Sequence, residues 1–179
     1  SVFNTSVNKD KSSISLRSLT EKKYLNPSIK MFLSILSDSV FPKNEMQLQK
    51  DRTLTSIAED ETDAADLASS LFFKEIYGDY PYAYNTIGQK NTVKKITRKD
   101  ILNFYKKNIN IGNASIVIVS SLSKKEVIDI SEKISKSLNL TAKESFEDKV
   151  LSDINKEKYI YKKFSSEQAH VYIGGLSIE

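Results

Sequence analysis

Apolar residues recur at intervals of three and four through residues 26–77, and this spacing predicts successive amphipathic helices. The first is expected to begin at Asn26, a good N-cap, with Pro27 at the first helical position, where its missing N–H costs nothing. Phe41-Pro42 is expected to end it. An amphipathic helix needs a second layer to cover its stripe, so the remaining segments must supply that layer.

Two further helices are predicted before residue 78. One is expected from the N-cap Asn44 to about Glu59. Its predicted buried positions are Leu48, Leu54, Ile57 and Ala58. The next ends at Tyr77-Gly78, because glycine tolerates the positive φ that commonly follows a helix. Its apolar stripe comprises Ala64, Leu67, Ala68, Leu71, Phe72 and Ile76.

Segments with β character flank this helical region. Residues 1–7 and 12–19 are expected to form a hairpin. The β-branched run "ASIVIVSS", 114–121, is expected to be a strand buried on both faces, and 159–164 and 169–176 are expected to be two more strands. This order predicts an α+β fold, with helices packed on one face of a mainly antiparallel sheet.

Two later helices have clear starting signals. Thr97 with Asp100, and Ser123 with Glu126, have the spacing of a capping box. The second of these helices is expected to bury Val127, Ile130, Ile134 and Leu138.

The residue inventory restricts the chemistry of this chain. There is no cysteine and one histidine, His170, so disulfides, thiolate metal sites and a two-histidine zinc site within this chain are excluded. A net charge of +4 among 179 residues does not favour a nucleic-acid partner, and no apolar run is long enough to span a membrane. We interpret His170 as an ordinary strand histidine and the acids at 59–66 as helix-capping residues. No catalytic residue is assigned.

The segment "YGDYPYAYNTIG", Tyr77 to Gly88, contains four tyrosines, one proline and two of the chain's glycines. Its rings could form a binding surface, or they could pack against one another and the neighbouring helices. We interpret them as packing residues first and as substrate contacts second.

Several segments, in order, resemble the M16 metallopeptidase family of insulinase, pitrilysin and the mitochondrial processing peptidase. "VFPKNEMQLQKDRTLTSIAED" resembles the family's long helix, and "LFFKEIYGDYPYAYNTIG" resembles the segment after it, with Tyr80 in place of His and Ala83 in place of Gly. "VKKITRKDILNFYKKNI" is similar to the helix that follows. "ASIVIVSSLSKKEV" resembles a family strand and turn, with Ser120 and Ser121 replacing Gly and Asp, and "SSEQAHVYIGG" resembles the start of a second homologous domain.

The resemblance implies a division of the chain. Residues 1–142 would be the C-terminal portion of a first M16-like domain, 143–154 a linker, and 155–179 the opening strands of a second domain. The first domain would then be incomplete, and the family's zinc motif, His-x-x-Glu-His, is expected upstream of residue 1.

The resemblance also implies where a third zinc ligand would lie. Counting back from Tyr77 without a gap, the family's ligand Glu falls on Ser56 and an accessory acid falls on Gln49. Neither side chain can replace a carboxylate in zinc binding or acid–base catalysis. A shift of three residues would bring Glu59 to the ligand position, at the expense of the apolar register around Ile57.

These departures favour a non-catalytic M16-like domain that binds or positions peptide substrate and pairs with a zinc-bearing M16 partner. Zinc is expected only in that partner or in an upstream segment, and this chain has no cofactor of its own. One alternative is a fragment of an active zinc metalloendopeptidase, and another is an interaction module without a protease partner. The resemblance favours the bacterial periplasm, with the cytoplasm as the alternative compartment. Self-association through the incomplete sheet is also expected.

Overall fold

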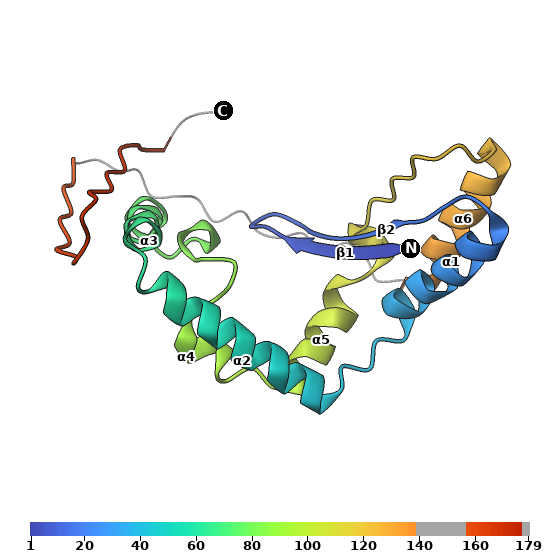
Figure 1. Ribbon diagram of the computed structural model, residues 1–179, viewed down its shortest axis with the longest axis horizontal. Helices are drawn as coiled ribbons and strands as arrows, with labels where there is room; N and C mark the ends of the chain where they lie inside the picture. Colours follow the sequence, from blue (N-terminus) through green and yellow to red (C-terminus); the bar gives the residue numbers. More distant parts are fainter. Residues whose placement is uncertain (139–156, 177–179) are drawn as a thin grey trace. The chain divides into compact units, whose positions relative to one another are not determined.

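A computed structural model describes residues 1–138 and 157–176 of the chain (Figure 1). The described residues have the predicted α+β composition, with a two-stranded antiparallel sheet and α-helices. The chain divides into two compact units. Unit 1 comprises Ser1–Met46 and Thr97–Ser145, and unit 2 comprises Gln47–Ile96 and Phe146–Glu179.

Unit 1 begins with the predicted hairpin. Strands β1, Val2–Val7, and β2, Ser12–Arg17, pair antiparallel, with Val2 opposite Arg17. The Asn8 side-chain oxygen accepts hydrogen bonds from the backbone N–H groups of Asp10 and Lys11, at 2.9 and 2.8 Å, and so closes the turn. Alternate residues of β2, Ile14 and Leu16, are half-buried, as the period-two pattern predicts.

Helix α1 spans Lys22–Ser37, so the predicted start and end are both wrong. The helix begins five residues before Pro27, which lies inside it, and the residue at the N-cap position is Glu21 rather than Asn26. Pro27 removes one hydrogen bond, which would join its nitrogen to the carbonyl of Lys23. Both residues are on the exposed side of the helix, where water can hydrate that carbonyl. The helix ends four residues before Phe41.

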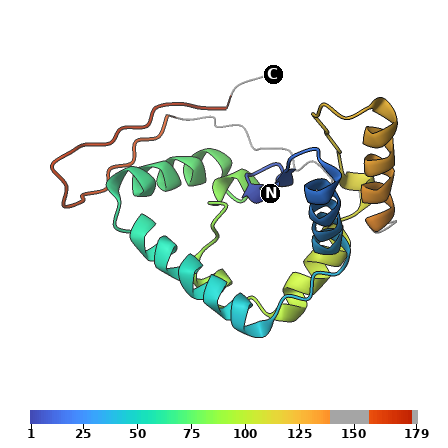
Figure 2. The same cartoon turned by 45° about the vertical axis from the view of Figure 1, so that its right-hand side comes forward.

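The core of unit 1 lies between α1 and α6, Lys124–Ser137, which run side by side in both views (Figures 1 and 2). Leu36, Ile134 and Leu138 are its buried residues. Half-buried side chains surround them: Ile14, Phe32, Leu33, Ile109, Ile111, Ile116 and Ile130. Of the four residues predicted to be buried on this helix, Ile134 and Leu138 are buried and Ile130 packs half-buried against them, whereas Val127 is half-buried outside this cluster.

Both predicted capping boxes are present. In front of helix α5, Arg98–Asn108, the Thr97 hydroxyl donates to the Asp100 carboxylate at 2.6 Å, and in front of α6 the Ser123 hydroxyl donates to Glu126 at 2.7 Å. The backbone N–H of each capping residue also donates to that carboxylate. Each box satisfies N–H groups that a helix start would leave without partners.

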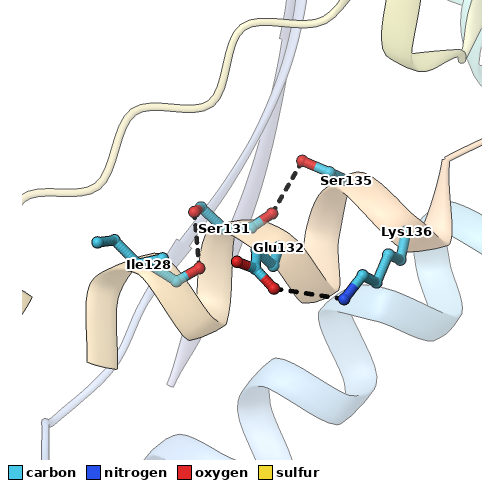
Figure 3. Close-up of polar contacts among 5 residues, drawn as sticks. All are labelled: Ile128, Ser131, Glu132, Ser135 and Lys136. Carbon is cyan, nitrogen blue, oxygen red and sulfur yellow. Dashed lines mark hydrogen bonds and ion pairs between the residues drawn. The ribbon is translucent and has the colours of Figure 1, made fainter. Parts of the chain in front are cut away.

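The polar side of α6 is stabilised by its own residues (Figure 3). The hydroxyl groups of Ser131 and Ser135 donate to the carbonyl oxygens of Ile128 and Ser131, at 2.8 and 3.0 Å. Lys136 and Glu132 form an ion pair at 3.3 Å with both side chains largely exposed. An exposed pair at this spacing contributes only about 0.3–0.5 kcal/mol, so this face is a solvated helix surface.

The predicted strand at 114–121 is not formed. These residues follow the short 3-10 turn η2, Ile111–Asn113, without regular structure, and Val117 and Val119 are 83% and 93% exposed. β-propensity reflects packing against neighbouring strands more than an intrinsic backbone preference. Among the described residues the sheet contains only β1 and β2, paired with each other, so this run has no neighbour.

Unit 2 contains most of α2, Lys43–Asp60, and all of α3, Ala64–Tyr77. Helix α2 begins at Lys43, so Asn44 lies in its first turn instead of capping it. Ile57 is buried as predicted and Leu54 is half-buried, but Leu48 and Ala58 are exposed. Helix α3 has the predicted bounds, and Gly78 follows it with a φ of 56°. A 3-10 turn η1, Pro81–Ala83, and the short α4, Lys90–Val93, complete this part of unit 2.

Residues 159–164 and 169–176 do not form the predicted strands. They have strand-like composition, but no backbone ladder joins them to one another or to another described segment. The predicted linker, 143–154, lies outside the described residues, and the division into two M16-like domains stays a prediction. No helix in residues 1–138 or 157–176 is long and apolar enough to cross a membrane.

Candidate functional site

The residues predicted at the zinc-ligand and accessory-acid positions all lie on α2. Gln49 and Ser56 are seven residues apart, about two helical turns, and therefore share one side of the helix. Gln49 is exposed and Ser56 is half-buried, next to the buried Ile57. Glu59, the alternative ligand, is exposed one turn further along. The alignment that assigns these positions stays a prediction.

One acidic residue between α2 and α3 acts as a helix-capping group. Asp63 is the N-cap of α3, and its carboxylate accepts hydrogen bonds from the N–H groups of Ala65 and Asp66, at 2.8 and 3.0 Å. Asp66 lies in the first turn, where a negative charge suits the helix dipole. Within the described parts of the chain, no three His, Cys, Asp or Glu residues are placed to hold a metal ion together.

Two tyrosines after α3, Tyr80 and Tyr82, pack into one aromatic cluster with the end of that helix. The rings of Phe73 and Tyr77 are stacked, with centroids 6.1 Å apart and an interplanar angle of 16°. Tyr77 also contacts Tyr80 at 6.3 Å and Tyr82 at 5.5 Å, and those two rings are 5.4 Å apart. Such pairs add stability beyond the area they bury. All four rings are half-buried, so each keeps some accessible surface.

Lys74 fixes the start of this tyrosine segment. Its ammonium group donates to the carbonyl of Gly78 at 2.7 Å and pairs with Asp79 at 3.0 Å. It also lies over the ring of Tyr84, 4.9 Å from the centroid. The hydrogen bond that Lys74 donates to the Asp79 carboxylate is the main cause that raises the pKa of Lys74 above its ordinary value of 10.5. Lys74 of α3 therefore holds Gly78 and Asp79 at the start of the segment, and it also contacts Tyr84 further along.

Two glycines shape the same segment. Gly78 and Gly88 have φ values of 56° and 91°, which other residues adopt only at a cost. A Cβ on Gly88 would also lie 3.0 Å from a methyl carbon of Val93, itself buried. The backbone conformation of the segment thus depends on glycine at both positions.

The C-terminal residues contact the same helix. Lys158 forms an ion pair with Glu75, and the ring of Tyr172 lies 5.6 Å from that of Phe72. Gly174 approaches Phe72 so closely that a Cβ would lie 2.9 Å from the ring carbon Cζ. Phe72 and Glu75 are three residues apart on one side of α3. One face of α3 is therefore covered by residues that lie about ninety positions later in the sequence.

His170 lies in this C-terminal stretch and is exposed, and the strand that was predicted around it does not form. Of the two glycines that follow, Gly174 permits the close approach to Phe72, and Gly175 has open space around it.

Three comparisons bear on the family. Residues 95–177 match the family model described as the peptidase M16 inactive domain. The "non-peptidase homolog YmxG" of Helicobacter pylori is 26% identical over 174 residues, which are 94% of this chain and 39% of that protein. A crystal structure of a peptidase M16 inactive domain from Pseudomonas fluorescens superposes with a TM-score of 0.78 at 25% identity, over 85% of this chain and 36% of that one.

The chain resembles members of the M16 peptidase family. It is similar to that family's inactive domain in sequence from residue 95 onward and in fold over most of its length. The chain spans less than two fifths of the length of either relative. Gln49, Ser56 and Glu59 precede the matched residues, so the family model does not test their assignment.

Sequence reasoning missed the contacts that organise the site. The ring of Tyr84 stands ten residues from Lys74, and Phe72 is about a hundred residues from its partners Tyr172 and Gly174. The positive charge before a tyrosine-rich turn was a usable signal for the first contact, because a lysine in the last helical turn often binds the free carbonyl groups there. No local pattern indicates the second.

Proposed function

We propose that this chain is part of a non-catalytic M16 protein, which pairs with a zinc-bearing M16 peptidase and helps to hold its peptide substrate. The match of residues 95–177 to the inactive domain carries the proposal, since the model represents a form of the fold without peptidase activity of its own. The Helicobacter pylori relative, described as a non-peptidase homolog, supports it.

The residues of α2 agree with this role. If Ser56 and Gln49 stand where active members carry acids, the helix supplies neither a charged zinc ligand nor a second carboxylate. The peptide would then be bound by surfaces that need no metal ion. The aromatic cluster of Phe73, Tyr77, Tyr80 and Tyr82 is a candidate, since half-buried rings offer apolar area at low entropic cost.

Zinc content tests the catalytic part of the proposal. The protein that contains this chain should bind no stoichiometric zinc when purified from metal-supplemented medium and measured by elemental mass spectrometry. One zinc per chain that is lost on Glu59→Ala, and kept on both Ser56→Ala and the exposed control Glu61→Ala, would show that the alternative is right. The chain would then belong to an active zinc metalloendopeptidase, with Glu59 as a ligand.

The pairing is tested separately. A tagged copy of the parent protein, recovered from its own cells, should bring down a second protein whose sequence contains His-x-x-Glu-His, and the peptidase activity of the mixture should depend on both proteins. Recovery of stable complexes that lack any such protein would favour the third possibility, an interaction module without a protease.

We further propose a periplasmic location and a tendency to self-associate. Fractionation should place the parent protein with periplasmic markers, and recovery with cytoplasmic markers would contradict this. Self-association rests on exposed apolar residues such as Val117, Val119 and Ile173. Sedimentation velocity should therefore show larger species as concentration rises, and a single monomer boundary throughout would contradict that expectation.

A further inference from the structure

The C-terminal stretch, residues 157–176, is held on α3 by side chains and not by its backbone. Among the described residues, the one backbone–backbone hydrogen bond of the stretch joins the N–H of Ser166 to the carbonyl of Phe164, at 3.1 Å. No ladder connects the stretch to another described segment. Its attachment to α3 therefore depends on the contacts of Lys158, Tyr172 and Gly174.

The residues near Phe72 alternate between two sides of the stretch. Val171 and Ile173 are 77% and 93% exposed, whereas Tyr172 between them is 44% exposed and contacts the ring of Phe72. Gly174, two residues after Tyr172, approaches the same ring. Alternation with period two is typical of an extended chain, in which residues i and i+2 face the same side. Helix α3 therefore contacts an extended segment through every second residue.

The ring of Phe72 belongs to a continuous row of aromatic side chains. It meets the ring of Phe73 edge-on, with centroids 5.6 Å apart, and Phe73 stacks on Tyr77 of the aromatic cluster. Glu75, about one helical turn from Phe72, pairs with Lys158. This side of α3, which we call the Phe72 face and which comprises Phe72 and Glu75, thus offers an apolar ring and a carboxylate beside further rings.

We propose that the Phe72 face is a docking site for an extended peptide in which an aromatic residue is followed two positions later by a glycine. The C-terminal stretch occupies this face as an internal ligand, and an incoming peptide displaces it. The inference rests on the proposed function, because it assigns the peptide contact proposed there to α3.

Two properties of the contact fit an exchangeable and selective site. The ion pair of Lys158 and Glu75 joins side chains that are 67% and 36% exposed, and such pairs contribute little to stability. No backbone ladder has to be broken when the stretch leaves. Selectivity for glycine follows from the close approach, since a Cβ at position 174 would lie 2.9 Å from the Cζ of Phe72.

NMR spectroscopy of the chain of 179 residues, with isotope-labelled phenylalanine rings, can test this site. Gly174→Val should displace the chain's own stretch and shift the ring signals of Phe72. Addition of the unlabelled peptide QAHVYIGGL, residues 168–176, should then return these signals toward their positions in the unmodified chain. In fluorescence anisotropy with a labelled peptide, the unmodified chain should bind several-fold more weakly than Gly174→Val, because its tethered stretch competes at a high effective concentration.

Matched variants separate this site from unspecific binding. The same peptide with Gly174→Val should bind neither chain. Its binding should be restored by Phe72→Ala in the chain, where the smaller side chain makes room for the valine. Phe104→Ala, the same change at a 63% exposed position of α5, should not restore it. Circular dichroism establishes that the Gly174→Val chain is folded, and if it is not, Tyr172→Ala serves as the displaced chain.

Three results would overturn the proposal: Phe72 signals that stay unchanged in the displaced chain, equal affinity of the displaced and unmodified chains for the peptide, or equal binding of the two peptides. A change in the Phe72 signals when the unmodified chain alone is diluted would also overturn it, since the occupant would then be a second copy. The titration needs neither zinc nor a peptidase. Its failure would therefore leave the zinc and co-purification tests of the proposed function unaffected, and failure of those tests would leave the titration result standing.

Discussion

Truncation of Ile134 to alanine should destabilise unit 1 strongly, because this side chain is in the centre of the contact between α1 and α6. Ile134 is 8% exposed and packs with Leu36 and Leu138. The change removes three carbon atoms, each worth about 0.8 kcal/mol when buried, or about 2.4 kcal/mol of transfer free energy. The cavity left behind raises the cost, so we expect about 3 kcal/mol, within the range of about 2–5 kcal/mol found for such changes.

Ile128 provides the matched control, since it lies on the same helix and is 44% exposed. Ile128→Ala has the same chemistry and the same gain in helix propensity, but leaves no enclosed cavity, so it should cost about 1 kcal/mol or less. Thermal melting followed by circular dichroism measures both. For a chain of this size a loss of 3 kcal/mol corresponds to a decrease of about 6–12 °C in Tm. Equal decreases for the two variants would refute the assignment of Ile134 to the core.

Three further changes test other features. Asp63→Ala should lower the unfolding free energy by about 0.5–2 kcal/mol through the lost N-cap of α3, and Asp63→Asn should retain most of it; urea titration distinguishes the two. The capping hydroxyl groups lower the pKa values of Asp100 and Glu126 from 3.8 and 4.5. The two ionised carboxylates stabilise the folded state above the ordinary pKa values, and this contribution is lost as the pH decreases through the lowered pKa values of the folded state. The urea concentration at the unfolding midpoint should therefore decrease when the pH is lowered below about 4, and this decrease should be smaller in Asp100→Asn or Glu126→Gln. Gly174→Val should displace the C-terminal stretch from Phe72, which NMR spectra would show as changed ring signals. The smaller side chain of Phe72→Ala should make room for the valine and restore the contact. Unchanged ring signals in Gly174→Val would contradict the close approach.

The elements that were predicted correctly depend on short stretches of sequence. A capping box needs only a serine or threonine and an acid three residues later, and both examples form as expected. The hairpin likewise has its alternating pattern and its turn residues within one short segment, and α3 has its apolar periodicity and its C-terminal glycine within another. Local physics was sufficient for these elements because every interaction that defines them joins residues close in sequence.

The wrong predictions concern elements that need distant partners. Residues 114–121 have ideal strand composition, yet Val117 and Val119 are exposed because no described strand lies beside them. The start of α1 fails for another reason. The prediction put Pro27 at the first helical position, where a proline destabilises a helix least. In the structure Pro27 lies inside the helix, on its exposed side, and the packing of the opposite face allows the helix to tolerate it there. Packing of the whole helix outweighs the preference of one residue.

The same distinction applies to the candidate site. Tyr77, Tyr80 and Tyr82 pack against one another as predicted, and Tyr77 alone contacts three other rings, whereas a role in substrate contact stays a prediction. Their fixation by Lys74, and the cover that the C-terminal residues provide for Phe72, depend on the fold. The hydrogen bonds from Arg98 to the carbonyl groups of Phe41 and Val40 were also not predictable, because these partners are 57 and 58 residues away.

The environment of Ser56 gives the proposed loss of a zinc ligand a physical basis. Ser56 is half-buried beside the buried Ile57, whereas Glu59 is exposed. A carboxylate at position 56 would lose part of its hydration on folding, and a metal ion, another cation or hydrogen-bond donors would have to offset that loss. A serine there can donate to a helix carbonyl and needs no counter-charge. If position 56 is the ligand position of active M16 members, serine is therefore the kind of residue expected once the metal is gone, and the exposed Glu59 can remain charged without one.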